Sequence, residues 1–362
     1  MTWGFSDMRV EYRLDPKGYS DEDRTYYLDL LRVVSVFFVL VIHVVSTNGL
    51  NTPVESFHWK ALFFYWSLSE FSVPVLFMIS GALFLDPARD IRLEKLWKRN
   101  ILRIVVAFLF WSALYAPVKV WKDFHCFDTG ELLRCFFEGY VHLWFLYALI
   151  PLYVVVPFLR VIVKDEVLLK YFLLLTFVFS VLLPDLQKVP ALETTKWITG
   201  NLNMDMALFS RFSFYFVLGH YIHRKVFSKR ERRWIYLLGI AGALFAVLET
   251  YGYRGSLGGY GVYLTVHCVF QSCAIFLFAK EMRVASAFSR AHQWVTMMAK
   301  LSFGVYLVHM FVNGFFFHVL KWTTLCCNPF LSVPGLAVLV FGISACISYF
   351  LRKVPILGKY VV

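Results

Sequence analysis

Residues 32–43 read RVVSVFFVLVIH, an arginine and a histidine separated by ten uncharged residues. A segment this apolar belongs in a membrane or a deep core, where both polar side chains are costly. In a helix, an eleven-residue interval turns the chain by about three full turns, so Arg32 and His43 project from one face, about 16 Å apart along the axis. Asp29, three residues before Arg32, is placed to pair with it. The stretch predicts two polar depths on one face of a buried helix.

The composition of the whole chain points to a membrane. Of 362 residues, 59% are hydrophobic and only 17% are charged, and the mean hydropathy is +0.62. Soluble domains are nearer to half apolar and a quarter charged. The apolar residues form blocks of about twenty, the length with which a helix spans a hydrocarbon layer of about 30 Å. The sequence predicts an all-α, polytopic integral membrane protein of ten transmembrane helices, at residues 27–46, 62–85, 101–121, 143–163, 170–184, 206–223, 234–250, 260–279, 301–320 and 332–351.

These blocks leave room for a single membrane domain. We expect an N-terminal cytoplasmic tail at 1–26, the ten-span domain at 27–351 and a C-terminal cytoplasmic tail at 352–362. Residues 1–25 are polar and mixed in charge, without a signal-peptide pattern, so the first span is predicted to be retained. No internal repeat is visible in the sequence, which disfavours a transporter built from inverted repeats.

The distribution of basic residues predicts the orientation. The chain has 36 Lys and Arg and a net charge of +12, which on its own suggests a nucleic-acid partner. However, 25 of these residues fall in the two tails and alternate loops, and only 8 in the intervening loops. This alternation follows the positive-inside rule with both termini cytoplasmic. We therefore expect no nucleic-acid partner, and we place Arg32 near the cytoplasmic end of the first span and His43 in its outer half.

The cysteines give no sign of a metal site. Cys126 and Cys135 share one predicted outer loop, and Cys326 and Cys327 lie in another. If that face is oxidising, a disulfide within or between these loops is allowed. No CxxC pair or His/Cys cluster has metal-ligand spacing, so we predict no metal.

Basic side chains also mark the cytoplasmic mouth of the third span, in LWKRNILRIV at 96–105. Positive-inside anchoring fully explains Lys98 and Arg99. Arg103 lies one turn deeper, and on an α-helix it shares a face with Arg99. This face either anchors the span or contacts the phosphates of a cytoplasmic ligand.

The ninth span carries a polar stripe. Ser302, Tyr306, His309 and Asn313 recur at intervals of four, three and four residues, which places them on one helix face. Such a stripe forms hydrogen bonds between helices in many membrane bundles. His309 falls near the middle of the span, which makes it a candidate to line a site.

Two further side chains have two interpretations each. Glu70 is the only acid deep in any predicted span, near the depth of His43. It either orients the imidazole of His43, as the third member of a catalytic triad orients its base, or pairs with Arg211. Trp144, at the outer start of the fourth span, either stacks on a sugar or anchors the helix at the membrane interface.

Several stretches resemble one known family in the order in which they occur. The chain is similar to the acyltransferase type 3 family, membrane-bound O-acetylases of surface polysaccharides and lipids. That family carries an Arg, ten residues and a His in its first span. The resemblance covers most of residues 26–351 and is carried by LDLLRVVSVFFVLVIH at 28–43, VPVLFMISGALF at 73–84 with Ser80 and Gly81, HLWFLYALIPLYVVVP at 142–157, FSFYFVLGHYI at 212–222 and LSFGVYLVH at 301–309.

The resemblance implies an enzyme of the inner cell membrane. It would take an acyl group, acetyl in the first instance, from cytoplasmic acyl-CoA to a hydroxyl of an envelope glycan or lipid-linked sugar. A poorly solvated histidine favours the neutral form that a general base needs, which fits His43. A covalent acyl-histidine stays open beside that role. The family implies no acid at Glu70. It implies donor-binding roles for Arg32, Arg99 and Arg103, and site-lining roles for Ser80, Trp144, Tyr306 and His309.

Two other functions compete with this one. In a secondary transporter or flippase for lipids or glycans, the intramembrane Arg, Glu and His residues would form a substrate or proton path. The missing repeat and the few Gly and Pro breaks in the spans weigh against that function. A non-catalytic membrane scaffold would explain the spans but would leave the ordered polar pattern without a cause.

Overall fold

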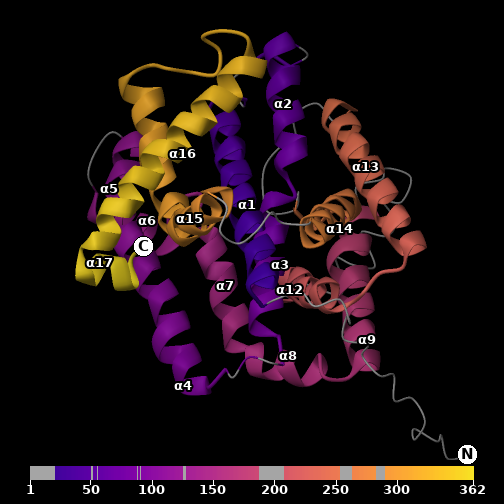
Figure 1. Cartoon of the computed structure of the whole chain (residues 1–362). Coiled ribbons are helices and arrows are strands. Elements are labelled where there is room, and N and C mark those ends of the chain that lie inside the picture. The colour runs from indigo at the N-terminus through magenta and orange to yellow at the C-terminus, as the bar shows by residue number, and fades with distance from the viewer. Residues whose placement is uncertain are drawn as a thin grey trace, which may run out of the picture.

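The computed structural model describes residues 21–49, 52–54, 56–87, 89, 91–124, 128–186, 208–252, 263–282 and 290–362, and all the regular structure in these ranges is helical (Figure 1). The helices are α1 (Asp21–Gly49), α2 (Phe57–Ser69), α3 (Ser72–Phe84), α4 (Leu93–Lys95), α5 (Leu102–Phe124), α6 (Thr129–Glu138), α7 (Trp144–Val154), α8 (Val156–Ile162), α9 (Glu166–Phe177), α10 (Leu183–Leu186), α12 (Leu208–Arg224), α13 (Lys229–Gly252), α14 (Val266–Glu281), α15 (Arg290–Gly314), α16 (Pro329–Lys353) and α17 (Pro355–Tyr360), with π-helical turns at Leu96–Ile101, Val178–Leu182 and Phe315–Val319.

The multi-pass prediction is confirmed in its coarse form. Within the described residues, seven helical stretches are long and apolar enough to cross a membrane, and the bent pair α7–α8 makes an eighth if it counts as one span. Each of the ten predicted blocks contains a helix. However, α12 has 17 residues and α14 has 16, so both are shorter than a full span. The structure thus supports seven or eight spanning stretches, and the predicted number of ten stays a prediction.

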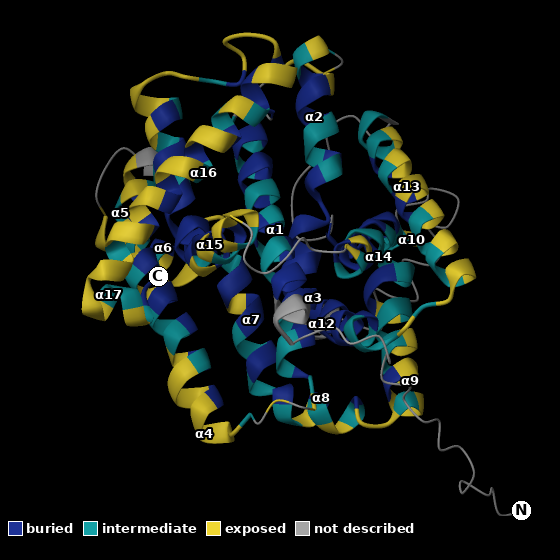
Figure 2. Ribbon diagram, in the orientation of Figure 1, coloured by how far each residue is buried: buried dark blue, intermediate teal, exposed yellow. Residues whose placement is uncertain are grey.

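The outer surface of the bundle fits a lipid environment. Figure 2 shows exposed residues along the outward faces of α13, α16 and α9, while α1, α3 and α12 are largely buried. Many of the exposed residues are large and apolar, among them Leu237, Ile240 and Leu248 on α13 and Leu331 and Phe350 on α16. An apolar surface this extensive is unfavourable in water and is typical of a face that contacts lipid.

Helices α3 and α12 pack with their backbones in contact. A Cβ atom on Gly81 of α3 would lie 1.7 Å from the carbonyl oxygen of Phe216, and one on Gly219 of α12 would lie 2.1 Å from that of Met78. No side chain fits in either place. Small residues that allow such close approach are typical of helix pairs in membranes. The Ser80–Gly81 and Leu218–Gly219 pairs therefore fix one wall of the bundle.

Two breaks interrupt the helices, one inside a spanning stretch and one at an end of the bundle. Glu70 and Phe71 separate α2 from α3. Helix α8 turns by 59° from α7 and lies across the end of the bundle at the bottom of Figure 1, near α4. Phe158 and Val161 of α8 are 71% and 64% exposed. A short helix across the bundle end with exposed apolar side chains is suited to the membrane interface.

The segment that follows α16 folds back onto the bundle. Helix α17 packs against α5, and both Val361 and Val362 are buried. The indole Nε1 of Trp111 donates to the carbonyl oxygen of Val361 (3.1 Å), and Nη2 of Arg103 donates to that of Val362 (2.8 Å). Residues 352–362, which we predicted to form a tail, therefore contribute to the packed structure beside α5.

Candidate functional site

Three histidines from distant parts of the chain meet inside the bundle. His43 comes from α1, His142 from the turn before α7, and His309 from α15. The ring centroids of His43 and His309 are 5.1 Å apart, those of His142 and His309 are 5.0 Å apart, and those of His43 and His142 are 6.4 Å apart. His142 and His309 are completely buried, whereas His43 is partly exposed. We refer to these three residues as the histidine cluster.

The packing of α1 on α15 holds His43 in place. The side-chain amide of Asn313 donates to Oγ1 of Thr47 (2.9 Å) and to the backbone carbonyl of His43 (3.3 Å). Thr47 donates to the same carbonyl at 2.7 Å. The residues of the predicted polar stripe on α15 thus have different roles. His309 belongs to the histidine cluster and Tyr306 lies beside it, whereas Asn313 holds α1. Ser302 donates to the carbonyl of Ala299 in its own helix.

Two tyrosines hold His142 against α15. Tyr115 of α5 donates to the carbonyl oxygen of Leu307 (2.8 Å), and the hydroxyl of Tyr306 donates to the carbonyl of His142. The ring of Tyr115 also packs edge-on against His142, with centroids 5.0 Å apart. Neither Tyr115 nor His142 was among the predicted site residues, although His142 lies in one of the stretches that resemble the family.

A second group of polar residues lies toward the other end of the same helices. The hydroxyl of Tyr153 in α7 lies near the side chain of Ser80, which donates to the carbonyl of Leu76 (3.1 Å), and within electrostatic range of Arg32 and Arg103. We call Tyr153, Ser80, Arg32 and Arg103 the inner cluster. The predicted pairing of Arg32 with Asp29 is confirmed, with Nη1 donating to Oδ1 at 2.8 Å.

The two clusters are joined by similar intervals along three helices. Arg32 and His43 are eleven residues apart on α1, which is about 16 Å along a helix, and Tyr153 of α7 lies eleven residues after His142, which is in the turn before that helix. Arg103 and Tyr115 are twelve residues apart on α5. The same interval that identified His43 is therefore the sequence signal that identifies Tyr153, which we had missed.

The predicted donor-binding arginines have different surroundings. The guanidinium of Arg103, besides donating to Val362, lies 5.0 Å above the ring of Phe303 on α15, and its buried Nε has no hydrogen-bond partner among the described residues. Arg99 is exposed on the π-helical turn Leu96–Ile101. In a π-helical turn the α-helical spacing does not apply, so the shared face that we predicted for the two arginines does not follow from their interval.

Glu70 is held by a different histidine. Its carboxylate Oε2 lies 3.1 Å from Nε2 of His267 on α14, and Nδ1 of His267 lies 3.2 Å from a carboxylate oxygen of Glu249 on α13. The structure shows no contact between Glu70 and His43. The side chain of Arg211, the other predicted partner, lies outside the described residues. His267 thus lies between Glu70, at the break between α2 and α3, and Glu249 of α13.

Trp144 also packs within the protein. Its ring stacks on that of Tyr263, with centroids 5.7 Å apart and planes inclined by 21°, and lies 5.4 Å from the ring of Phe212. The two predicted roles of Trp144, stacking on a sugar and anchoring at the membrane interface, stay predictions.

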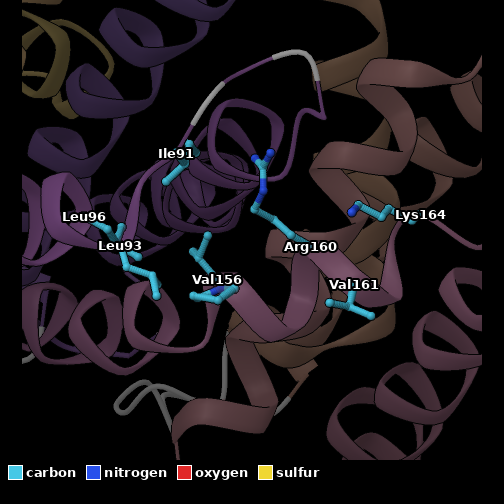
Figure 3. Close-up of a pocket in the computed structure, with 8 residues that line it drawn as sticks. Ile91, Leu93, Leu96, Val156, Arg160, Val161 and Lys164 are labelled. Atoms are coloured by element: carbon cyan, nitrogen blue, oxygen red, sulfur yellow. The ribbon is translucent and has the colours of Figure 1, made fainter.

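A cavity of about 240 Å³ lies at the end of the bundle that carries the inner cluster (Figure 3). Arg160 of α8 lines it and donates to the carbonyl oxygens of Phe84 (2.9 Å), Asp86 (3.0 Å) and Arg89 (2.9 Å), which holds the segment after α3. Lys164 makes no ion pair with any described residue. The remaining lining is apolar, and it belongs to α8 and to the segment around α4: Ile91, Leu93, Leu96, Val156, Pro157 and Val161.

In the described part of the chain, no group of His, Cys, Asp and Glu side chains is arranged to hold a metal ion. Cys135 is buried, and the sulfur atoms of Cys326 and Cys327 are 3.8 Å apart, a distance at which they form no disulfide. Cys126, the other candidate for a disulfide, lies outside the described residues.

Comparison with known proteins adds one finding. The model of the family described as "Acyltransferase domain", of acyltransferase type 3, matches residues 25–351. No curated protein and no solved structure matches the chain. The match includes every residue of the histidine cluster and of the inner cluster, and it ends before α17.

Proposed function

The chain belongs to the acyltransferase type 3 family, and from this premise we propose that it is a membrane O-acyltransferase. The donor is cytoplasmic acyl-CoA, with acetyl as the first candidate group. The acceptor is a hydroxyl of an envelope glycan or a lipid-linked sugar. The observation that carries this proposal is the buried histidine cluster, which lies about 16 Å from a cluster of two arginines and a tyrosine along shared helices.

The inner cluster suits the donor. The thioester of acyl-CoA lies at the end of a thin pantetheine arm, and the phosphates lie at the other end. Arg32 and Arg103 beside Tyr153 provide positive charge where the arm would enter the bundle. The cavity lined by Arg160 and Lys164 lies just beyond, since Val156 in its wall follows Tyr153 by three residues, across the bend between α7 and α8. We assign this cavity to the nucleotide end of the donor, because apolar surface and cations together match a base and phosphates.

At the histidine cluster, His43 acts as the general base. The acceptor hydroxyl gives its proton to a ring nitrogen of His43 while its oxygen bonds to the carbonyl carbon of the thioester. The carbon–sulfur bond then breaks, and the sulfur takes the proton back from the imidazolium. The products are the ester on the acceptor and the free thiol of CoA. His43 suits this role because it is the one residue of the cluster that is not fully buried.

The orientation that the charges predict completes the proposal. Both termini and the cavity beside α8 face the cytoplasm, and the histidine cluster lies toward the outer half of an inner cell membrane. Ten spans, with α12 and α14 counted among them, keep both termini on one side. In this arrangement the donor enters from the cytoplasm, and the acceptor approaches from the other face.

The decisive experiment compares the acetyl content of envelope glycans, by mass spectrometry, in cells with the protein, without it, and with His43→Ala. We expect the acetyl mass to be lost in both of the latter, while the variant is inserted and folded like the parent protein. Membranes from the same cells should transfer label from acetyl-CoA only when His43 is present. Unchanged glycans without the protein would exclude this function, and movement of a glycan between two compartments without acylation would indicate a carrier.

A further inference from the structure

The hydrogen bonds of two cluster histidines determine which ring nitrogen carries the proton. Nδ1 of His309 lies against the backbone carbonyl oxygen of Tyr306, and Nε2 of His142 lies 3.3 Å from that of Leu307. A carbonyl oxygen accepts hydrogen bonds and cannot donate them. The proton of neutral His309 is therefore on Nδ1, and the proton of neutral His142 is on Nε2.

The second ring nitrogen of each of these two histidines therefore carries no proton and can only accept a hydrogen bond. Nε2 of His309 and Nδ1 of His142 are both buried, and no described residue donates a hydrogen bond to either. Buried polar atoms without a partner are rare, because each one loses its contact with water and gains nothing in return. Two such atoms on neighbouring rings, with centroids 5.0 Å apart, indicate that this site is completed by hydrogen donors that are supplied during function.

The ring of His43 is one such donor. Its centroid lies 5.1 Å from that of His309. An N–H···N hydrogen bond of about 2.9 Å joins two imidazole rings at nearly this separation, so a rotation of the His43 ring is enough to form it. A base also needs an acceptor for its second nitrogen, as the aspartate of a catalytic triad provides for its histidine. Glu70, which we expected in that role, lies against His267 instead.

On the basis of the function proposed above, we propose that His309 is the positioning residue for His43 and that His142 binds the acceptor. Nε2 of His309 accepts the N–H of His43, so the other nitrogen of His43 is left bare to take the proton of the reacting hydroxyl. Nδ1 of His142 accepts a hydrogen bond from a hydroxyl of the acceptor. The acceptor is thus a molecule with at least two free hydroxyls close together, one that reacts and one that binds His142.

Amide substitutions test these assignments because they imitate one ring nitrogen at a time. The side-chain amide of Gln reaches the position of Nε2, and that of Asn reaches the position of Nδ1. His309→Gln therefore keeps a hydrogen-bond acceptor toward His43, and His309→Asn keeps only the hydrogen bond to the carbonyl of Tyr306. For His142 the order is reversed, since His142→Asn keeps the acceptor and His142→Gln keeps only the bond to Leu307.

We measure label transfer from acetyl-CoA in membranes that contain the native acceptor substrate. We expect the rate to stay high in the variants that retain the hydrogen-bond acceptor atom. His309→Gln and His142→Asn should stay within roughly tenfold of the parent rate, whereas His309→Asn and His142→Gln should fall by roughly 100-fold or more, in kcat rather than in the KM for acetyl-CoA. Thermal stability should follow the opposite order, because the bonds to Tyr306 and Leu307 are kept in the other two variants. His318→Asn and His318→Gln, on an exposed histidine nine residues further along, are the matched controls.

The outcomes separate this inference from the proposed function. If the parent protein transfers label but activity follows the order of thermal stability, the two histidines have only a structural role and the inference is wrong. Equal losses in all four variants, or none, also overturn it. If the parent protein itself transfers nothing, the proposed function fails, whatever the variants do.

Discussion

Among the single residues of the candidate site, Arg103 has two different sets of neighbours. It lies beside Tyr153 in the inner cluster, and it also donates to the carbonyl of Val362. Its buried Nε has no hydrogen-bond partner in the described structure. A guanidinium with a donor to spare is suited to an anionic group. The contact with Val362 keeps the side chain ordered when no such group is bound.

The substitution Arg103→Ala should weaken donor binding more than catalysis. A lost hydrogen bond to a charged group costs about 1.5–3 kcal/mol, which corresponds to a rise in the KM for acetyl-CoA of roughly 10- to 100-fold with a much smaller change in kcat. Steady-state kinetics in membranes measures both quantities. The control is Arg99→Ala, which removes an exposed charge and should raise the KM less. Equal KM values for the parent and Arg103→Ala would leave Arg103 with a purely structural role.

The sequence predicts single-helix relations among site residues well and relations between helices poorly. Arg32, His43 and Asp29 are connected by helical geometry alone, and the structure confirms the ion pair. The meeting of His43 with His142 and Tyr115 depends on how α1, α5 and α7 pack, for which a single sequence has no direct signal. Glu70 shows the same limit, because its depth was predicted but its partner, His267, is on a helix that no periodicity connects to it.

At the scale of helices, the contact of α3 with α12 is the most restrictive in the molecule. The substitution Gly81→Ala would place a methyl group 1.7 Å from the backbone of Phe216, which no rotamer change relieves. Overpacking of this kind costs about 1–3 kcal/mol or more. We expect a clear fall in the thermal midpoint of the purified protein. The control is Gly342→Ala on α16, where nothing lies within 4 Å of the new atom.

In that control the helix propensity of alanine acts alone, so Gly342→Ala should be neutral or slightly stabilising, by up to about 1 kcal/mol. If Gly81→Ala unfolds at the same temperature as the parent protein, the two backbones are not in contact as described.

An ion-pair network fixes α6 to α5. Glu138 accepts hydrogen bonds from Arg134 (2.8 Å) and from Lys119 of α5 (2.9 Å). These two bonds, that of Arg134 above all, lower the pKa of Glu138 to about 2, below its usual value of 4.5. A carboxylate with a lowered pKa stabilises the folded state fully above its unfolded pKa, and this contribution disappears as the pH falls through the folded pKa.

The substitution Glu138→Gln should therefore lower the thermal midpoint at pH 6. The difference from the parent protein should shrink as the pH falls from about 4.5 to about 2, where the parent carboxylate is itself protonated. Thermal unfolding of both proteins across this range measures the effect, which is small because the pair is exposed. A difference that does not depend on pH would mean that the charge of Glu138 has no part in it.

For the whole molecule, the composition was enough to predict an all-helical membrane protein, but not to count its spans. The ten apolar blocks correspond to helices, yet α12 and α14 are shorter than a bilayer. Both are packed inside the bundle, where α12 contacts α3, α9 and α14. A helix surrounded by other helices is apolar all round whether or not it reaches both membrane faces. The hydropathy of such a helix therefore does not show whether it is long enough to cross the membrane.

Orientation is tested on the intact cell. Cys326 and Cys327 are exposed, and the charge distribution predicts that they lie on the outer face. We expect a maleimide that does not cross membranes to label them in intact cells, once the outer barrier is permeabilised where there is one. Replacing both with serine should abolish this labelling. Labelling that requires disruption of the inner membrane would reverse the proposed topology.

The close approach of α3 and α12 also limits how the protein can move. Two helices whose backbones touch cannot slide or rotate past one another without a clash, so they behave as one rigid plate. If a thioester must pass between helices to reach the histidines, the movement has to involve another helix pair, and α5 and α7 are the candidates because they carry Tyr115 and Tyr153. Spectroscopic probes should report a constant α3–α12 separation and a variable α5–α7 separation during turnover.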